Sequence, residues 1–210
     1  MKQKILLATI IICCTATMQA QIPKETLWLG GFINFSGNST DGNSSEQSNS
    51  SVAFVPAIGT AIMENLVVGG EFHYYHTKYE STPPTNNQIT EEVGVGVFAR
   101  KYIPIVNRFY IYGHGDLGFS SIINKRFGEK GRGWATTLGL HPGASFAINK
   151  ILQIESGFNN LFYIRYVKAN VPELNRTETK QESYNVGVSL ENGGQFYVGF
   201  RLLLPGKKSS

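Results

Sequence analysis

The sequence predicts an all-β fold, an eight-stranded antiparallel up-and-down transmembrane β-barrel. Three observations indicate this fold. After a short apolar leader, the chain alternates apolar residues with polar residues or glycine over segments of about ten residues, the length of a tilted membrane-spanning strand. The connections between these segments are alternately long and short. The composition is rich in glycine and aromatic residues, with 23 Gly, 13 Phe and 10 Tyr, whereas only 16% of the residues are charged.

The first twenty residues have the features of a secretory signal peptide. Two lysines precede an apolar run over residues 5–14, and Ala20 offers a small residue at the expected cleavage point. The apolar run is too short to span a membrane as a helix. A lipoprotein signal is the alternative, because Cys13 and Cys14 lie in the right zone, but isoleucines precede Cys13 where lipid attachment prefers a small residue. We therefore expect residues 1–20 to be removed by simple cleavage.

The composition of the remaining chain excludes several classes of protein. Both cysteines lie in the leader, so the mature chain has no disulfide, no thiol nucleophile and no thiolate metal site. The formal net charge is only +4, and acidic residues are interspersed with basic ones, so we expect no binding of nucleic acid. No later apolar stretch reaches about 18 residues, which excludes a helical membrane protein. We expect residues 21–204 to form the barrel and residues 205–210 to form a polar tail.

Eight segments have the two-residue periodicity of strands whose faces meet different surroundings. One face of each segment is apolar and suits lipid, whereas the other presents glycine, charged and phenolic side chains and suits a filled interior. In the clearest segment, Ile111 and Leu117 alternate with Tyr112 and Asp116. The predicted strands are 26–36, 52–62, 66–75, 93–102, 109–120, 134–146, 152–159 and 195–204.

The connections between the predicted strands favour a membrane barrel over a Greek-key sandwich. Outer-membrane barrels have tight turns on the periplasmic side and longer loops outside, and a chain that enters from the periplasm meets a long loop first. The short connections are 63–65, 103–108 and 149–150, and the predicted external loops are 37–51, 77–89, 121–133 and 160–183. The first of these loops consists almost entirely of Ser, Asn, Gly and acidic residues, so we expect it to be flexible.

The third predicted loop contains a cluster of basic residues. They are Lys125, Arg126, Lys130 and Arg132. A solvated loop is the plainer interpretation of this cluster. The functional interpretation is contact with lipopolysaccharide phosphates just above the membrane.

The inward-facing side chains predict a closed polar network. An eight-stranded barrel has an interior just wide enough to be filled by side chains. We expect two arginines to pair with three carboxylates there and to seal the lumen. The predicted network contains Glu71, His73, Arg100, Tyr110, Tyr112, His114, Asp116, His141, Glu155 and Arg201.

Aromatic residues near the strand ends predict interfacial girdles or reflect ordinary β-propensity; they are Trp28, Tyr102, Phe109, Tyr110, Trp134, Phe162 and Tyr163.

The same residues give little indication of catalysis or metal binding. His114, Asp116 and Ser120 are the best candidates for a lipid-modifying site, but they follow one another along a single strand and do not converge as a triad. His114 and His141 lie on different strands, and no histidine spacing along the chain suggests a metal ligand set. We expect no catalytic residues, no metal and no cofactor.

Four segments resemble the outer membrane protein β-barrel domain family, in particular its members from Bacteroidota. They are 55–74, 93–120, 138–161 and the closing FYVGFRLLL, and the resemblance extends from about Leu27 to Leu204. It implies an eight-stranded, OmpA/OmpX-like barrel without shared catalytic residues. One feature departs from the family: such barrels usually end on an aromatic residue that the insertion machinery reads, whereas this last strand ends on Leu204.

Together these inferences favour an integral barrel of the bacterial outer membrane with a structural or surface-interaction role. The expected partners are outer-membrane lipid and lipopolysaccharide, the barrel insertion machinery, and an extracellular or host partner reached by the long loops. A small-solute conduit is the first alternative and requires a gap in the interior network. A soluble lipocalin-like ligand-binding barrel and a lipid-modifying barrel enzyme are further alternatives. A soluble barrel would place its apolar residues inside, opposite to the predicted parity.

Overall fold

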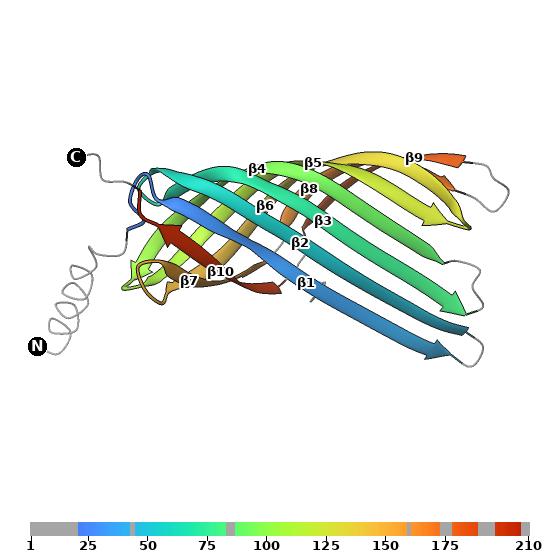
Figure 1. Cartoon of the computed structure of the whole chain (residues 1–210), viewed down its shortest axis with the longest axis horizontal. Helices are drawn as coiled ribbons and strands as arrows, with labels where there is room; N and C mark the ends of the chain where they lie inside the picture. The colour runs from blue at the N-terminus through green and yellow to red at the C-terminus, as the bar shows by residue number, and fades with distance from the viewer. Residues whose placement is uncertain are drawn as a thin grey trace, which may run out of the picture.

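A computed structural model describes residues 21–42, 45–82, 87–158, 161–172, 178–188 and 196–206. The predicted signal peptide and residues 207–210 of the predicted tail lie outside the described residues. Ten strand segments form one antiparallel sheet (Figure 1). In the part of the chain that is described, no helix is both long and apolar enough to cross a membrane.

Eight of the segments form a closed ring in which each pairs with its neighbours in antiparallel register. The ring runs through β1 to β7 in chain order and then β10, which pairs with both β7 and β1. The predicted eight-stranded up-and-down barrel is therefore confirmed. The bounds are β1 (Leu27–Gly42), β2 (Ser45–Met63), β3 (Leu66–Thr82), β4 (Gln88–Val106), β5 (Phe109–Arg126), β6 (Glu129–Ala147), β7 (Leu152–Phe158) and β10 (Phe196–Leu204).

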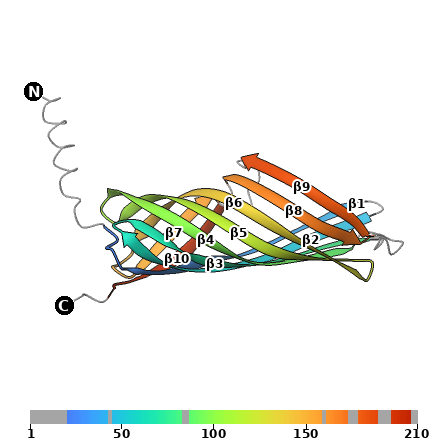
Figure 2. The same ribbon diagram turned by 90° about the horizontal axis from the view of Figure 1, so that it is seen from above.

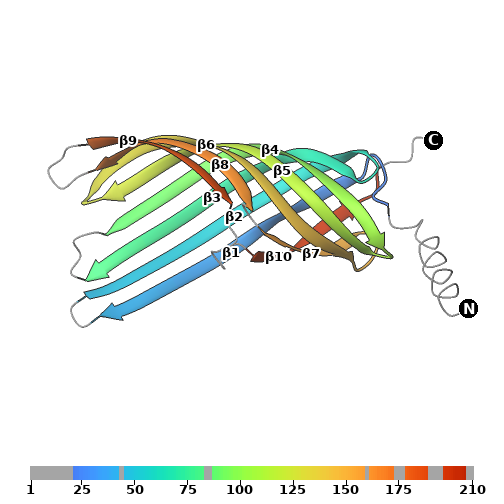
Figure 3. The same ribbon diagram turned by 180° about the vertical axis from the view of Figure 1, so that it is seen from behind.

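The barrel has two distinct ends, and the strands run obliquely between them (Figure 2). We call the end where Leu27 of β1 pairs with Leu204 of β10 the near end. The opposite end, where β1 and β2 meet at the pair Gly42↔Ser45, is the far end. β7 and β10 lie toward the near end (Figure 3).

The remaining two segments, β8 (Phe162–Pro172) and β9 (Glu178–Val188), extend the wall toward the far end (Figure 3). β8 pairs with the middle of β6, from Gly133 to Leu140, whereas β7 pairs with its last residues, from Gly143 to Ala147. β9 pairs with β8 along its whole length. Among the described residues, the far part of β1 pairs only with β2, and β9 pairs only with β8. The described wall is thus closed in its near half and has two sheet edges in its far half.

The strands are longer than the sequence predicts, and the prediction of long loops is wrong. β1 and β2 remain paired to Gly42↔Ser45, and β5 and β6 remain paired to Arg126↔Glu129. Most described residues of 37–51, 77–89, 121–133 and 160–183 belong to strands. A ladder that already exists in the barrel wall is easily extended, and cross-strand contacts such as the 2.6 Å hydrogen bond between Ser36 Oγ and Ser51 Oγ stabilise the extension.

The alternation of side chains along the strands has the predicted parity. Val95, Ile111 and Phe200 are 63%, 42% and 62% exposed on the outer surface, whereas Arg100 is 3% exposed in the interior. Similar outward apolar side chains occur on all eight strands of the ring and form an apolar belt, which includes Ile33, Phe54, Ile58, Phe72, Val97, Leu117, Leu138, Phe146, Phe158 and Val198. An outward apolar surface around a polar interior is the arrangement of a membrane barrel.

The prediction of interfacial girdles is wrong for three of the seven aromatic residues. Trp28, Tyr102 and Tyr110 are almost fully buried in the barrel interior near its near end. Their polar atoms explain this position, because Trp28 Nε1 donates a hydrogen bond to the Tyr102 hydroxyl at 2.9 Å. Phe109 and Trp134 are exposed on the outer surface.

Candidate functional site: the polar interior of the barrel

Polar side chains fill the interior in two groups at different depths. The group at the near end, which we call the plug, contains Trp28, Arg100, Tyr102, Tyr112, Glu155 and Arg201. The group farther along the axis lines a cavity of about 440 Å³, and we call it the cup. Its charged and histidine side chains are Glu71, His73, Glu92, Asp116, His141 and Arg165, with His114 at the boundary to the plug.

Glu155 lies at the centre of the plug, between two arginines. Arg100 Nη1 donates hydrogen bonds to both of its carboxylate oxygens, at 2.8 and 2.7 Å. Arg201 Nε lies 2.9 Å from Glu155 Oε2 in an ion pair that lacks hydrogen-bond geometry. The Tyr102 hydroxyl donates a further hydrogen bond to the same carboxylate at 2.9 Å. All three charged side chains are at most 3% exposed, so this ion pairing is buried.

Aromatic rings accommodate the extra positive charge of the plug. Two arginines share one carboxylate, and both guanidinium groups lie over the ring of Trp28, at 4.9 and 5.2 Å from its centroid. Arg100 also lies over Tyr112 at 4.4 Å. A cation is attracted to the face of an aromatic ring, and this attraction is larger where water is excluded. The plug therefore combines ion pairing with cation–π contacts.

The chain segment before β1 covers the near end below the plug. The Ile22 backbone N–H donates to Asn65 Oδ1 at 2.8 Å, and the Asn65 N–H donates to the Ile22 carbonyl at 3.0 Å. The Ile22 side chain is buried in the same apolar cluster as Trp28 and Tyr102. These contacts tie the first described residues to the turn between β2 and β3.

In the cup, each carboxylate has its own partner. Glu71 Oε1 lies 2.8 Å from His73 Nε2. Arg165 Nη2 donates to Glu92 Oε2 at 2.7 Å, and the Ser120 hydroxyl donates to the other oxygen of Glu92. The third carboxylate, Asp116, contacts a histidine. Arg165 is the one arginine of these pairs, so carboxylates outnumber arginines in the cup, which is the reverse of the plug.

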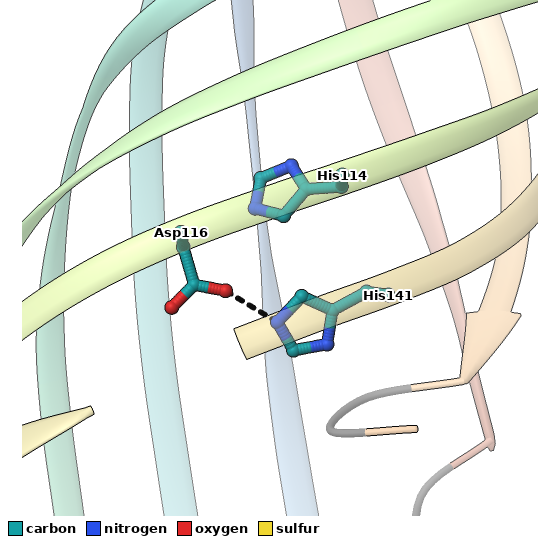
Figure 4. A group of neighbouring side chains, drawn as sticks. All are labelled: His114, Asp116 and His141. Atoms are coloured by element: carbon teal, nitrogen blue, oxygen red, sulfur yellow. Dashed lines mark hydrogen bonds and ion pairs between the residues drawn. The ribbon is translucent and has the colours of Figure 1, made fainter. Parts of the chain in front are cut away.

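Two histidines and an aspartate form a compact cluster at the base of the cup (Figure 4). His114 on β5 and His141 on β6 are direct cross-strand partners, with ring centroids 5.4 Å apart. Asp116 lies two residues along β5, and its Oδ1 contacts His141 Nε2. Arg100 Nε donates to His114 Nδ1 at 3.1 Å, which connects the cluster to the plug.

A comparison with known families agrees with this architecture. The family described as the outer membrane protein beta-barrel domain matches residues 5–191. The chain belongs to this family. The outer-membrane barrel is therefore located in the outer membrane, where its apolar belt faces lipid. No curated protein matches the chain. The family is generally non-enzymatic.

The outer-membrane barrel places all the residues of the predicted lumen network in its interior, but not with the predicted pairs. Arg100 and Arg201 both contact Glu155, whereas the prediction paired them with three different carboxylates. The other two carboxylates of the prediction pair with histidines. The network residues are Glu71, His73, Arg100, Tyr110, Tyr112, His114, Asp116, His141, Glu155 and Arg201; Tyr110 packs on Tyr102, and the hydroxyl of Tyr112 contacts that of Tyr197.

Sequence reasoning missed Glu92 and Arg165, which pair across the cup of the barrel. Arg165 falls in the predicted loop 160–183, and Glu92 falls between the predicted loop 77–89 and the predicted strand 93–102. A signal was available in the sequence after Leu161, because Phe162, Ile164 and Tyr166 alternate with residues of the opposite face. These residues belong to β8, and the alternation along this strand places Arg165 on the inner side.

The structure also places two other groups of residues from the sequence analysis, and only the second group lies elsewhere than expected. Ser120 donates its hydroxyl proton to Glu92 and not to a histidine, so the trio of His114, Asp116 and Ser120 does not converge. The basic cluster Lys125, Arg126, Lys130 and Arg132 does not lie in a loop. Its members belong to the ends of β5 and β6, where Lys125 is paired with Lys130 and donates from its Nζ to Glu91 at 2.8 Å.

Proposed function

We propose that this outer-membrane barrel is a structural and surface-interaction protein without catalytic activity, whose lumen is sealed by the plug. The observation that supports sealing is the buried contact of Glu155 with Arg100 and Arg201 across the near end of the interior. A path for ions would have to pass between these side chains. Separating them would leave buried charges unpaired, at a cost of about 3–5 kcal/mol.

The far end suits contact with partners outside the cell. We propose that the near end faces the periplasm and that the paired extensions of β1 to β6 project beyond the outer leaflet. Their polar side chains suit a hydrated surface, and the basic residues at the tips of β5 and β6 suit lipopolysaccharide phosphates. The proposed partners are thus membrane lipid, lipopolysaccharide, the barrel insertion machinery and an extracellular or host molecule.

A small-solute conduit is the second candidate. The cavity of about 440 Å³ in the cup favours it, because this space is large enough for water and small solutes. A conduit also needs the plug to open, since the contacts of Glu155 cross the axis below the cavity. The two candidates therefore differ in one property, the ion conductance of the plug.

Conductance across planar lipid bilayers separates the two candidates. The refolded wild-type barrel is expected to give no steady open channel. Glu155→Ala is expected to give measurable conductance, because it removes the shared partner of both arginines. Glu64→Ala, in the exposed turn between β2 and β3, is the matched control and should behave as the wild type. A steady channel of porin size in the wild type would overturn sealing and favour the conduit.

A further inference from the structure

We propose that His114, Asp116 and His141 form a binding site for one divalent transition-metal ion of the kind that prefers imidazole, such as Zn²⁺, Ni²⁺ or Cu²⁺. The site lies at the base of the cup, between β5 and β6 (Figure 4). The proposal is independent of whether the plug seals the lumen.

The three side chains are close enough to share a metal ion. One ligand atom of each lies within 4.8 Å of those of the other two. In a tetrahedral site with metal–ligand bonds of about 2.0–2.2 Å, neighbouring ligand atoms stand about 3–4 Å apart. Small rotations of the side chains close this difference. The backbones that carry them are adjacent strands in continuous register, so the cluster is held together before a metal binds.

The positions of the protons in the cluster suit replacement by a cation. His114 Nδ1 accepts a hydrogen bond from Arg100 Nε, so a neutral His114 has its proton on Nε2. This nitrogen is on the side of the ring that faces the other two residues (Figure 4). His141 Nε2 contacts Asp116 Oδ1, so it also holds a proton there. Two imidazole N–H groups therefore converge on one carboxylate, and a metal ion bound to that carboxylate would occupy their place.

Metal binding requires a defined change of tautomer. Each imidazole binds the ion through the lone pair of Nε2, so a neutral ring moves its proton to Nδ1 and a protonated ring releases the proton from Nε2. For His114 this change breaks the hydrogen bond from Arg100 Nε. Arg100 keeps its two hydrogen bonds to Glu155, so the plug stays paired when the metal is bound.

The surroundings favour a cation with room for a further ligand. All three residues line the cavity of the cup, which can supply a water molecule as the fourth ligand. The neighbouring pairs Glu71–His73 and Glu92–Arg165 add two carboxylates and one arginine, so the cup attracts cations. Two imidazoles and one carboxylate suit Zn²⁺, Ni²⁺ or Cu²⁺ better than Ca²⁺ or Mg²⁺, which prefer oxygen ligands.

The cup contains its own control for this site. Glu71 and His73 form another carboxylate–histidine pair in the same cavity, with a similar exposed fraction. Among the described residues, the candidate metal cluster does not include this pair. A site that requires two histidines should therefore depend on His114 and His141 but not on His73.

Titration of the refolded mature barrel, without the two cysteines of the predicted signal peptide, with Co²⁺ in detergent tests the proposal, because the visible absorption of Co²⁺ reports four-coordinate binding. We expect one Co²⁺ per barrel, displaced by Zn²⁺. The variants His141→Gln and Asp116→Asn each remove a ligand and should weaken Co²⁺ binding at least about tenfold, because the loss of a residue that only supports a ligand already costs about that much. His73→Gln should bind Co²⁺ as the wild type does. Heat-modifiable migration on a gel identifies the variants that fold.

A second measurement on the unaltered protein covers the case in which a ligand variant does not fold. In ¹H–¹⁵N spectra of the imidazoles, Zn²⁺ should shift the Nε2 signals of His114 and His141 and leave those of His73 and His76 in place. No Co²⁺ uptake at millimolar concentration would overturn the proposal. So would equal weakening in His73→Gln, or Zn²⁺ shifts in the spectra that miss the two ligand histidines.

Discussion

The plug and the cup contain the same kinds of charged side chain but stabilise them in different ways. In the plug, Glu155 is shared by two arginines, and aromatic rings take the place of solvent. In the cup, each carboxylate has its own partner and borders a cavity. The comparison shows two ways to place charged side chains inside a narrow barrel. Where two arginines share one carboxylate, the side chains pack without a cavity, and where each carboxylate has a separate partner, a cavity remains beside them.

The largest expected effect follows from removing the negative charge of the plug. Glu155→Gln keeps the shape of the side chain but leaves Arg100 and Arg201 without a carboxylate. Because both guanidinium groups are almost fully buried, we expect the free energy of unfolding to fall by about 3–5 kcal/mol. Urea unfolding of the refolded barrel in lipid vesicles measures this loss. A change as small as that of a surface substitution would show that the plug is hydrated.

A smaller effect is expected from the same chemical change in the cup. Asp116→Asn removes the carboxylate that contacts His141, but an amide still forms hydrogen bonds and the adjacent cavity admits water. We expect a loss of about 1 kcal/mol in the same unfolding measurement, in the range of one hydrogen bond. The losses of unfolding free energy in Glu155→Gln and Asp116→Asn then show how much more strongly the plug depends on its carboxylate than the cup does. Equal losses would contradict the division of the interior.

The smallest effect is expected on the extended strands beyond the apolar belt. Lys168 and Glu182 form an ion pair between β8 and β9, with both side chains about half exposed. An exposed pair of this kind contributes little to stability, because water screens it. Lys168→Ala should leave the unfolding midpoint unchanged within error. A clear shift would show that β8 and β9 are more enclosed than the described residues indicate.

The parity of the membrane-spanning strands could be predicted from sequence for a physical reason. In the apolar belt, successive residues face lipid and the polar interior in turn, so Val95 and Arg100 differ in hydropathy according to their face. Beyond the belt both faces meet water. The alternation then disappears, and the Ser- and Asn-rich strands at the ends of β1 and β2 have the composition of loops.

The candidate metal cluster could not be found from spacing along the chain, because it depends on the register between two strands. The register follows from a two-residue turn at Phe127 and Gly128, whose φ angles are 54° and 78°. Such turns are usually recognised by the sequence Asn-Gly or Asp-Gly, and a turn that begins with phenylalanine lacks this signal. Once the turn is known, His114 falls opposite His141. The pairing of Glu155 with Arg100 depends on closure of the whole ring, which no local pattern shows.

The division of the interior is tested most directly by the accessibility of single cysteines. Both native cysteines lie in the predicted signal peptide, so the mature barrel offers a cysteine-free background. Thr137→Cys would place a thiol in the cup, and Ser145→Cys would place one beside Gln153 in the buried near end. We expect a small charged thiol reagent, added outside intact cells, to modify Thr137→Cys and to leave Ser145→Cys unmodified. Equal modification of both would contradict a sealed plug beneath an open cup.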